Sequence, residues 1–163
     1  MPTKPHILII EARFYDENAD QLLAGAKAAL DKAGATYEVL TVPGILELPP
    51  AAHFAFTKGT SLDGRAYNGL VVLGCAVKGE TDHYEHVCRE SMTGVRQVSM
   101  LLQIPTGNGI LTCPTWELAQ ARANPQGPDD VGGRAARACL RMIEIKQQFS
   151  LQAQPHAPSK YTL

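Results

Sequence analysis

The stretch LGCAVKGETDHYEHV, Leu73–Val87, decides the fold because it joins a buried strand directly to a long helix. The apolar run 70–77 is typical of a strand that is covered on both faces, as strands of parallel sheets are. From Asp82 to about Leu102, apolar residues recur at helical spacing. A strand that leads into a helix is the repeating unit of α/β folds.

The same unit recurs along the chain. Apolar runs predict strands, and amphipathic spacing with capping residues, prolines and glycines at the ends predicts helices. This alternation predicts a four-stranded parallel sheet in a three-layer α/β/α sandwich of the flavodoxin-like type. We expect residues 1–149 to form one domain and residues 150–163 to be a flexible C-terminal tail. The expected strands are 6–12, 36–42, 70–77 and 107–113, and the expected helices are 16–33, 49–59, 82–102, 115–123 and 135–149.

The composition narrows the class of protein. With 163 residues, 45% hydrophobic and 19% charged, the chain suits one soluble globular domain. A net charge of −1 does not indicate the basic surface patch that nucleic-acid-binding proteins need. No apolar run approaches the roughly 20 residues that a membrane helix needs. The apolar segment near the N-terminus is followed at once by Glu11 and Arg13, so we interpret it as a core strand rather than a signal peptide.

The four cysteines occur singly, with no CxxC pair. Each lies in an apolar context, which is typical of small buried thiols in a reducing compartment. We therefore expect a cytoplasmic protein without disulfides.

Polar and aromatic side chains follow three of the predicted strands. In open parallel sheets ligands bind outside the carboxyl ends of the strands, so these residues should meet although they are distant in sequence. This convergence predicts a binding site at that edge of the sheet. The residues are Phe14, Glu47, Lys78, Glu80, Thr81 and His83.

KGETDH carries the strongest local signal of a site. Gly79 lets the backbone approach a ligand, and the amides of residues 80–82 at a helix N-terminus suit phosphate. The alternative is ordinary capping by Thr81 or Asp82. His83 could move protons near neutral pH, pair with His86 as metal ligands, or simply be solvated.

Three other candidates have both a functional and an ordinary interpretation. Phe14 could stack on a flat ring or belong to the core. Glu47 could bind the hydroxyls of a polyol or favour a helix start. Arg122 suits phosphate recognition, although most exposed arginines are only solvated. The residues alone thus predict a site for a small anionic ligand without naming a reaction.

Five motifs in order identify a family resemblance. They are ARFYD (12–16), VPGILELP (42–49), LGCAVKGETDHYEHV (73–87), GNGILT (107–112) and ELAQARA (117–123). Through them the chain resembles the 6,7-dimethyl-8-ribityllumazine synthases of riboflavin biosynthesis, from Ile7 to about Phe149. The resemblance implies a transferase that condenses 5-amino-6-(D-ribitylamino)uracil with 3,4-dihydroxy-2-butanone 4-phosphate. Lumazine, phosphate and water are the products, and neither a cofactor nor a metal is implied.

The resemblance also implies roles for individual residues. His83 matches the proton-transfer histidine, and Phe14 matches the residue that stacks on the pyrimidine. Glu47 matches the contact to the ribityl hydroxyls. His86 then becomes a bystander. The other implied contacts are Ile45, Leu46, Cys75, Ala76, Val77 and Asn108 for the pyrimidine and ribityl chain, and Glu80, Thr81 and Arg122 for the phosphate.

Three positions depart from the family pattern. Asn108 stands where many relatives carry a Phe that comes from a neighbouring subunit. Val131 stands where many relatives have a Lys near the phosphate, and Arg134 stands where many have a Glu. Arg134 could restore the missing cation, or this region could simply have drifted. These departures leave open a flavin-binding or assembly protein that has lost catalysis, or a phosphate-binding module without chemistry.

The family resemblance further implies a homo-oligomer with the active site between subunits of a pentamer. Some members pack pentamers into an icosahedral shell (60-mer). The altered, proline-containing stretch 124–131 favours a free pentamer here.

Overall fold

The computed structural model describes residues 3–57 and 64–152. The end of the predicted helix 49–59 and most of the predicted tail 150–163 therefore lie outside the described residues. The elements are β1 (His6–Ala12), α1 (Asp16–Lys32), β2 (Thr36–Val42), the 3-10 turn η1 (Ile45–Glu47), α2 (Leu48–Thr57), β3 (Gly69–Val77), α3 (His83–Leu101), β4 (Thr106–Cys113), α4 (Trp116–Ala123) and α5 (Val131–Gln152).

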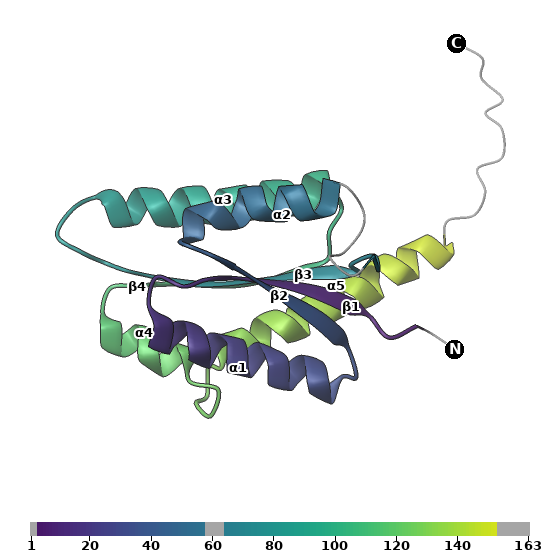
Figure 1. The fold of residues 1–163 in the computed structure, drawn as a ribbon, viewed down its shortest axis with the longest axis horizontal. Helices are drawn as coiled ribbons and strands as arrows, with labels where there is room; N and C mark the ends of the chain where they lie inside the picture. Colours follow the sequence, from purple (N-terminus) through teal and green to yellow (C-terminus); the bar gives the residue numbers. More distant parts are fainter. Residues whose placement is uncertain (1–2, 58–63, 153–163) are drawn as a thin grey trace, which may run out of the picture.

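The four strands form one parallel sheet in the order β2-β1-β3-β4. Ile10 of β1 is paired with Leu40 of β2 and with Val72 of β3, and Val72 is paired in turn with Asn108 of β4. Helices α2 and α3 cover one face, and α1, α4 and α5 cover the other (Figure 1). The predicted three-layer sandwich with a four-stranded parallel sheet is confirmed.

Two hydrophobic clusters fill the space on either side of the sheet. Ile7 and Ile9 of β1 pack towards α1 and α5, while the alternate residues Leu8 and Ile10 pack towards α2 and α3. All four are essentially inaccessible to solvent. Burying each such side chain contributes about 1.5–3 kcal/mol, which explains why the central strand is apolar on both faces.

Helix α5 begins at Val131, four residues earlier than the predicted start at Ala135. The prediction was wrong because Gly132 and Gly133 were taken as part of a break. Asp130 stabilises this earlier start, since its carboxylate accepts a hydrogen bond from the Gly133 amide at 3.1 Å. The glycines are needed for packing, because a Cβ on Gly132 would lie 2.0 Å from the carbonyl oxygen of Leu22.

The ends of three helices also differ from expectation. Asp16 does not cap α1, because Tyr15 occupies the cap position and makes no side-chain cap bond. Helix α2 begins at Leu48, directly after η1, rather than at Pro49. Helix α5 continues to Gln152, three residues beyond the predicted end at Phe149. The predicted cap of α4 is confirmed, with Thr115 Oγ1 accepting from the Leu118 amide.

Within residues 3–57 and 64–152, none of the helices combines the length and the apolar character that crossing a membrane requires.

Candidate active site

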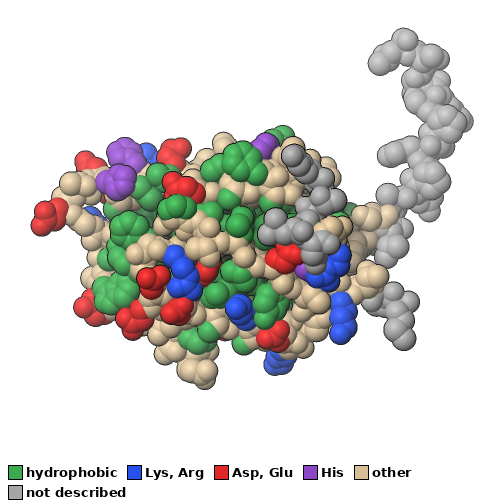
Figure 2. Space-filling model, in the orientation of Figure 1, with side chains coloured by type: hydrophobic (Ala, Val, Ile, Leu, Met, Phe, Trp, Pro, Cys, Tyr) green, Lys and Arg blue, Asp and Glu red, His purple; other side chains and the backbone are tan. Residues whose placement is uncertain are grey.

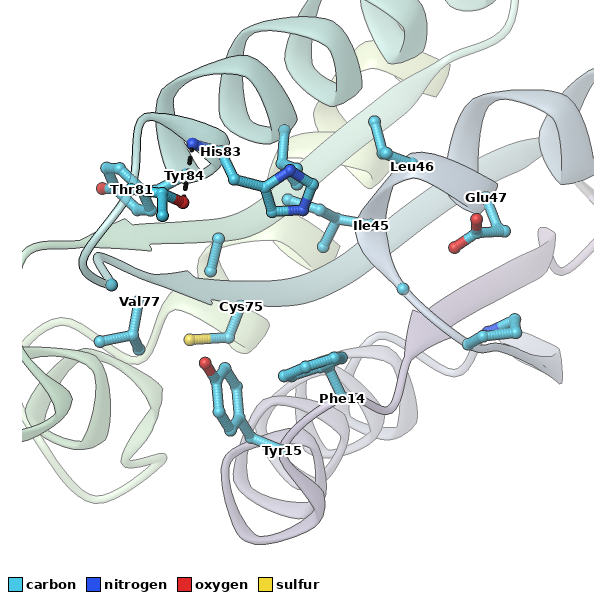
Figure 3. Close-up of a pocket in the computed structure, with 15 residues that line it drawn as sticks. Phe14, Tyr15, Ile45, Leu46, Glu47, Cys75, Val77, Thr81, His83 and Tyr84 are labelled. Carbon is cyan, nitrogen blue, oxygen red and sulfur yellow. Dashed lines mark hydrogen bonds between the residues drawn. The ribbon is translucent and has the colours of Figure 1, made fainter.

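A cavity of about 400 Å³ opens at the carboxyl edge of the sheet (Figure 3). Its walls come from the turn after β1, from the turn 43–47, from the end of β3 and from the first two turns of α3. Ten residues predicted from the sequence line it, although they come from around three separate strand-to-helix connections. They are Phe14, Ile45, Leu46, Glu47, Cys75, Ala76, Val77, Gly79, Thr81 and His83.

Four predicted site residues do not line this cavity. Lys78 directly follows β3, and its backbone amide donates to the Cys113 carbonyl oxygen at 3.0 Å. Glu80 is exposed in the turn before α3. Asn108 lies on β4 beside a second hollow, where its amide donates to the Met92 sulfur at 3.4 Å. Arg122 on α4 donates to the Cys113 sulfur at 3.9 Å. Their assignments to the site stay predictions.

The sequence pattern did not single out every residue of the walls. Tyr15 and Tyr84 line the cavity directly beside the predicted Phe14 and His83, and Pro43, Gly44 and Val87 complete the walls. The signal for the two tyrosines was present, because each follows a candidate residue at a strand-to-helix junction. The helical spacing of Val87 from His83 places both on one face of α3.

Arg13 fixes the turn that carries Phe14. Its side chain donates to the buried Glu11 at 2.8 Å and to Asp20 at 2.6 Å, and its backbone amide donates to Val42 at 3.1 Å. The bond to Glu11 is the main reason that the pKa of Arg13 is raised. The turn is thereby tied to β1, β2 and α1, while Phe14 itself is 72% exposed and stands at the rim of the cavity.

The apolar wall depends on a close approach between η1 and β3. Gly74 has no side chain, and a Cβ there would lie 2.5 Å from Ile45 Cγ2. The missing side chain lets Ile45 settle against the sheet at 4% exposure. Cys75, the next residue, contributes a neutral thiol, because burial raises its pKa from 9.0 to about 12.

The start of α3 forms the polar wall. His83 is its first residue, and the His83 amide is 3.4 Å from Thr81 Oγ1. The expected cap residue Asp82 makes no side-chain cap bond. In Figure 3 the His83 imidazole extends over the cavity towards η1. Gly79 and Thr81 line the cavity beside it, so the loop that leads into the positive end of α3 borders the same space.

His86 does not line the cavity. In the described part of the chain, no three His, Cys, Asp or Glu side chains gather closely enough to hold a metal ion. The pairing of His83 with His86 as metal ligands therefore gains no support.

The surface around the cavity carries apolar, acidic and histidine side chains together. In Figure 2 apolar side chains are exposed among acidic and histidine side chains at the end where α3 begins. The cavity thus combines an aromatic ring at its rim, an apolar slot, the exposed carboxylate of Glu47 and an imidazole at the start of α3. Such a site suits a flat heterocycle that carries a polar chain, placed next to a small anion.

Comparison with known proteins agrees with this chemistry. Residues 4–147 match the family model described as 6,7-dimethyl-8-ribityllumazine synthase. A 6,7-dimethyl-8-ribityllumazine synthase of Paramagnetospirillum magneticum is 49% identical over 148 residues, covering 90% of this chain and 98% of the relative. The Agrobacterium fabrum protein of the same name is 50% identical over 147 residues, with the same coverage.

A third relative, 6,7-dimethyl-8-ribityllumazine synthase 1 of Rhizobium meliloti, is 48% identical over 147 residues, covering 90% of this chain and 95% of the relative. The family match spans the whole sheet and every wall of the cavity. The chain therefore belongs to the 6,7-dimethyl-8-ribityllumazine synthase family.

Proposed function

We propose that this enzyme condenses 5-amino-6-(D-ribitylamino)uracil with 3,4-dihydroxy-2-butanone 4-phosphate to form 6,7-dimethyl-8-ribityllumazine, phosphate and two waters. The observation that carries the proposal is the meeting of Phe14, Glu47, Thr81 and His83 around one cavity, together with family membership over nearly the whole chain. The reaction is the penultimate step of riboflavin biosynthesis.

Different walls of the cavity bind different parts of the pyrimidine substrate. Phe14 stacks on the pyrimidine at the rim, and the slot between η1 and the end of β3 holds the ring edge. Ile45, Leu46 and the segment 75–77 form this slot, while Glu47 accepts hydrogen bonds from the ribityl hydroxyls. Much of the acceleration comes from holding the two substrates together, which turns a bimolecular encounter into a step within one complex.

Proton transfer is assigned to His83. The amine of the pyrimidine adds to the ketone carbonyl and water leaves to give an imine. Phosphate is then eliminated, and the second ring closes with loss of another water. Each step moves a proton at near-neutral pH, which suits an imidazole beside the reacting carbons. Gly79 and Thr81 at the start of α3 stabilise the phosphate as it leaves.

We further propose that the active site is completed by a neighbouring copy within a pentamer. Phe14 is 72% exposed although it belongs to the proposed binding surface, and both Asn108 and Arg122 lie away from the cavity of their own chain. A neighbour that packs against the rim would cover Phe14 and bring an arginine to the phosphate. Glu80 remains at the rim of the phosphate side.

Light scattering tests the assembly. A particle of about five times the 17.6 kDa chain is expected. A particle of megadalton mass would instead identify the icosahedral shell. The free thiols of Cys75, Cys113 and Cys139, all buried, agree with a cytoplasmic location, which we also propose.

The reaction is tested by mixing the enzyme with both substrates. Lumazine fluorescence and inorganic phosphate should appear together at equal molar rates. A protein that bound flavin or phosphate without catalysis would release neither, and that outcome would reject the proposed reaction.

A further inference from the structure

A chain of ring contacts joins the exposed Phe14 to two half-buried aromatic side chains, Tyr15 and Trp116. The ring centroids of Phe14 and Tyr15 are 5.0 Å apart in an edge-to-face arrangement, and those of Tyr15 and Trp116 are 5.1 Å apart. Tyr15 lines the cavity, and in Figure 3 its hydroxyl points towards the Cys75 sulfur. Trp116 does not line the cavity. Tyr15 therefore stands between the exposed ring that meets the ligand and a ring on another helix.

Trp116 is held firmly relative to α1. It is the first residue of α4, whose start is capped by Thr115. Three residues further along each helix, the Asn18 side-chain amide donates to the Ala119 carbonyl at 3.2 Å, and both residues are fully buried. Because the same two helices are joined at two successive points, the ring of Trp116 forms a fixed support for Tyr15.

From these contacts we propose that Tyr15 and Trp116 are positioning residues, which hold the Phe14 ring in the orientation that stacks on the pyrimidine. The inference rests on the proposed function and adds two residues to it. An exposed ring without support would have to be ordered when the substrate binds, and that entropy cost weakens affinity. Neither residue takes part in proton transfer, so the effect falls on binding of the pyrimidine rather than on turnover.

Variants at Trp116 test whether its packing on Tyr15 orients Phe14, and they leave the residues that line the cavity unchanged. In Trp116→Leu, the KM for the ribitylamino-uracil should rise about threefold to tenfold, the range expected for losing one aromatic pair. The kcat and the KM for the butanone phosphate should stay within about twofold. Trp116→Phe keeps a ring and should lie close to the unmodified enzyme. Glu117→Gln, at the next and exposed position of α4, is the matched control.

Double variants test whether Trp116 acts through Tyr15. Tyr15→Leu alone should raise the KM for the ribitylamino-uracil at least as much as Trp116→Leu does. Adding Trp116→Leu to Tyr15→Leu should cause no further rise, since the support is already broken. If the two effects multiply, or if the KM values for both substrates rise together, the positioning role is overturned.

Calorimetry separates this inference from the proposed reaction. Titration with the ribitylamino-uracil alone gives a Kd without turnover, and the same threefold to tenfold weakening is expected in Trp116→Leu. Circular dichroism and light scattering confirm that each variant is folded and assembled. If Trp116→Leu does not fold, Trp116→Met and Tyr15→Met replace it. An unmodified enzyme that binds the pyrimidine but makes no lumazine would refute the reaction alone, whereas an unchanged Kd in folded variants would refute the positioning role alone.

Discussion

Gly74 lies directly beneath Ile45, so that a Cβ on the glycine would come within 2.5 Å of the Ile45 Cγ2 atom. The contact joins the end of β3 to the turn η1 and thereby sets the width of the apolar slot. We expect Gly74→Ala to push η1 away from the sheet and to cost about 1–3 kcal/mol of stability, as overpacking does. The KM for the pyrimidine should rise with it.

A compensating change checks that interpretation. Ile45→Ala removes the clashing methyl, so the double variant Gly74→Ala/Ile45→Ala should be more stable than the sum of the two single effects predicts. Thermal unfolding and steady-state kinetics measure both quantities. Simple additivity of the two changes would show that the contact does not control the slot.

The two histidines at the start of α3 form a matched pair for mutation. His83 lines the cavity and His86, one turn further along the helix, does not. We expect His83→Ala to lower kcat by about a hundredfold, at the low end for loss of an acid–base group, because water reaches this exposed position and replaces part of the proton transfer. His86→Ala should leave kcat within about twofold.

Steady-state assays with both substrates saturating provide the measurement. Complete loss of activity in a folded, assembled His83→Ala enzyme would contradict the expected partial loss of kcat. It would assign His83 a role beyond proton transfer. Equal losses in the two variants would assign the effect to α3 as a whole.

Arg13 and Arg137 contrast a buried ion pair with an exposed one. The Glu11 carboxylate that pairs with Arg13 is only 4% exposed, and Glu11 Oε2 has no hydrogen-bond partner. Arg13→Ala leaves that carboxylate buried without a cation, which costs about 3–5 kcal/mol. Arg137 pairs with Asp130 at 3.5 Å and is 56% exposed, so Arg137→Ala should cost at most about 1 kcal/mol.

Chemical denaturation measures the loss of unfolding free energy in the Arg13→Ala and Arg137→Ala variants. The Arg13→Ala enzyme should in addition bind the pyrimidine more weakly, because the turn that carries Phe14 loses its ties to α1. A loss below about 1 kcal/mol in Arg13→Ala would mean that Glu11 is solvated in solution.

The buried thiols predict how stability depends on alkaline pH. Burial raises the pKa values of Cys75 and Cys139 from 9.0 to about 12. The folded state therefore holds both protons more tightly than the unfolded state does. The resulting stabilisation is complete below pH 9 and is lost as the pH rises towards 12.

Unfolding free energies measured from about pH 8 to about pH 11 should fall with rising pH, and the fall should be smaller in Cys139→Ala than in the unmodified enzyme. Alkylation by iodoacetamide near neutral pH should likewise be slow at Cys75 although this residue lines the cavity, because only the thiolate reacts. Rapid modification of Cys75, located by mass spectrometry, would contradict a raised pKa.

The sheet and most of the cavity could be predicted because both depend on local pattern. Apolar runs such as 70–77 mark buried strands, and residues after such strands converge in any parallel sheet. Phe14, Glu47 and His83 each follow from this rule, and all three line one cavity.

The features that the sequence did not predict depend on tertiary contacts rather than on local sequence pattern. Gly132 and Gly133 are poor helix formers by propensity, yet α5 includes them because neither site has room for a side chain. Gly132 packs against the Leu22 backbone, and Gly133 packs against the Asp130 carboxylate. Trp116 could not be placed behind Tyr15 from sequence, because that contact depends on how α1 and α4 pack although they lie far apart in the chain. Asn108 and Arg122 lie away from the cavity of their own chain, and under the pentamer proposed above their part in the site would depend on a neighbouring copy, which no pattern within one chain specifies.

The close contact between Gly132 and Leu22 has a consequence for engineering. Helix α5 is anchored by its own backbone against α1 and by the Asp130 cap, so its starting point does not depend on the length of the connecting segment 124–129. With Asp130 kept, that segment can be shortened, lengthened or replaced while the helix and the sheet beneath it stay in register. It is therefore the natural place to insert foreign loops, because the packing of the core does not depend on its length.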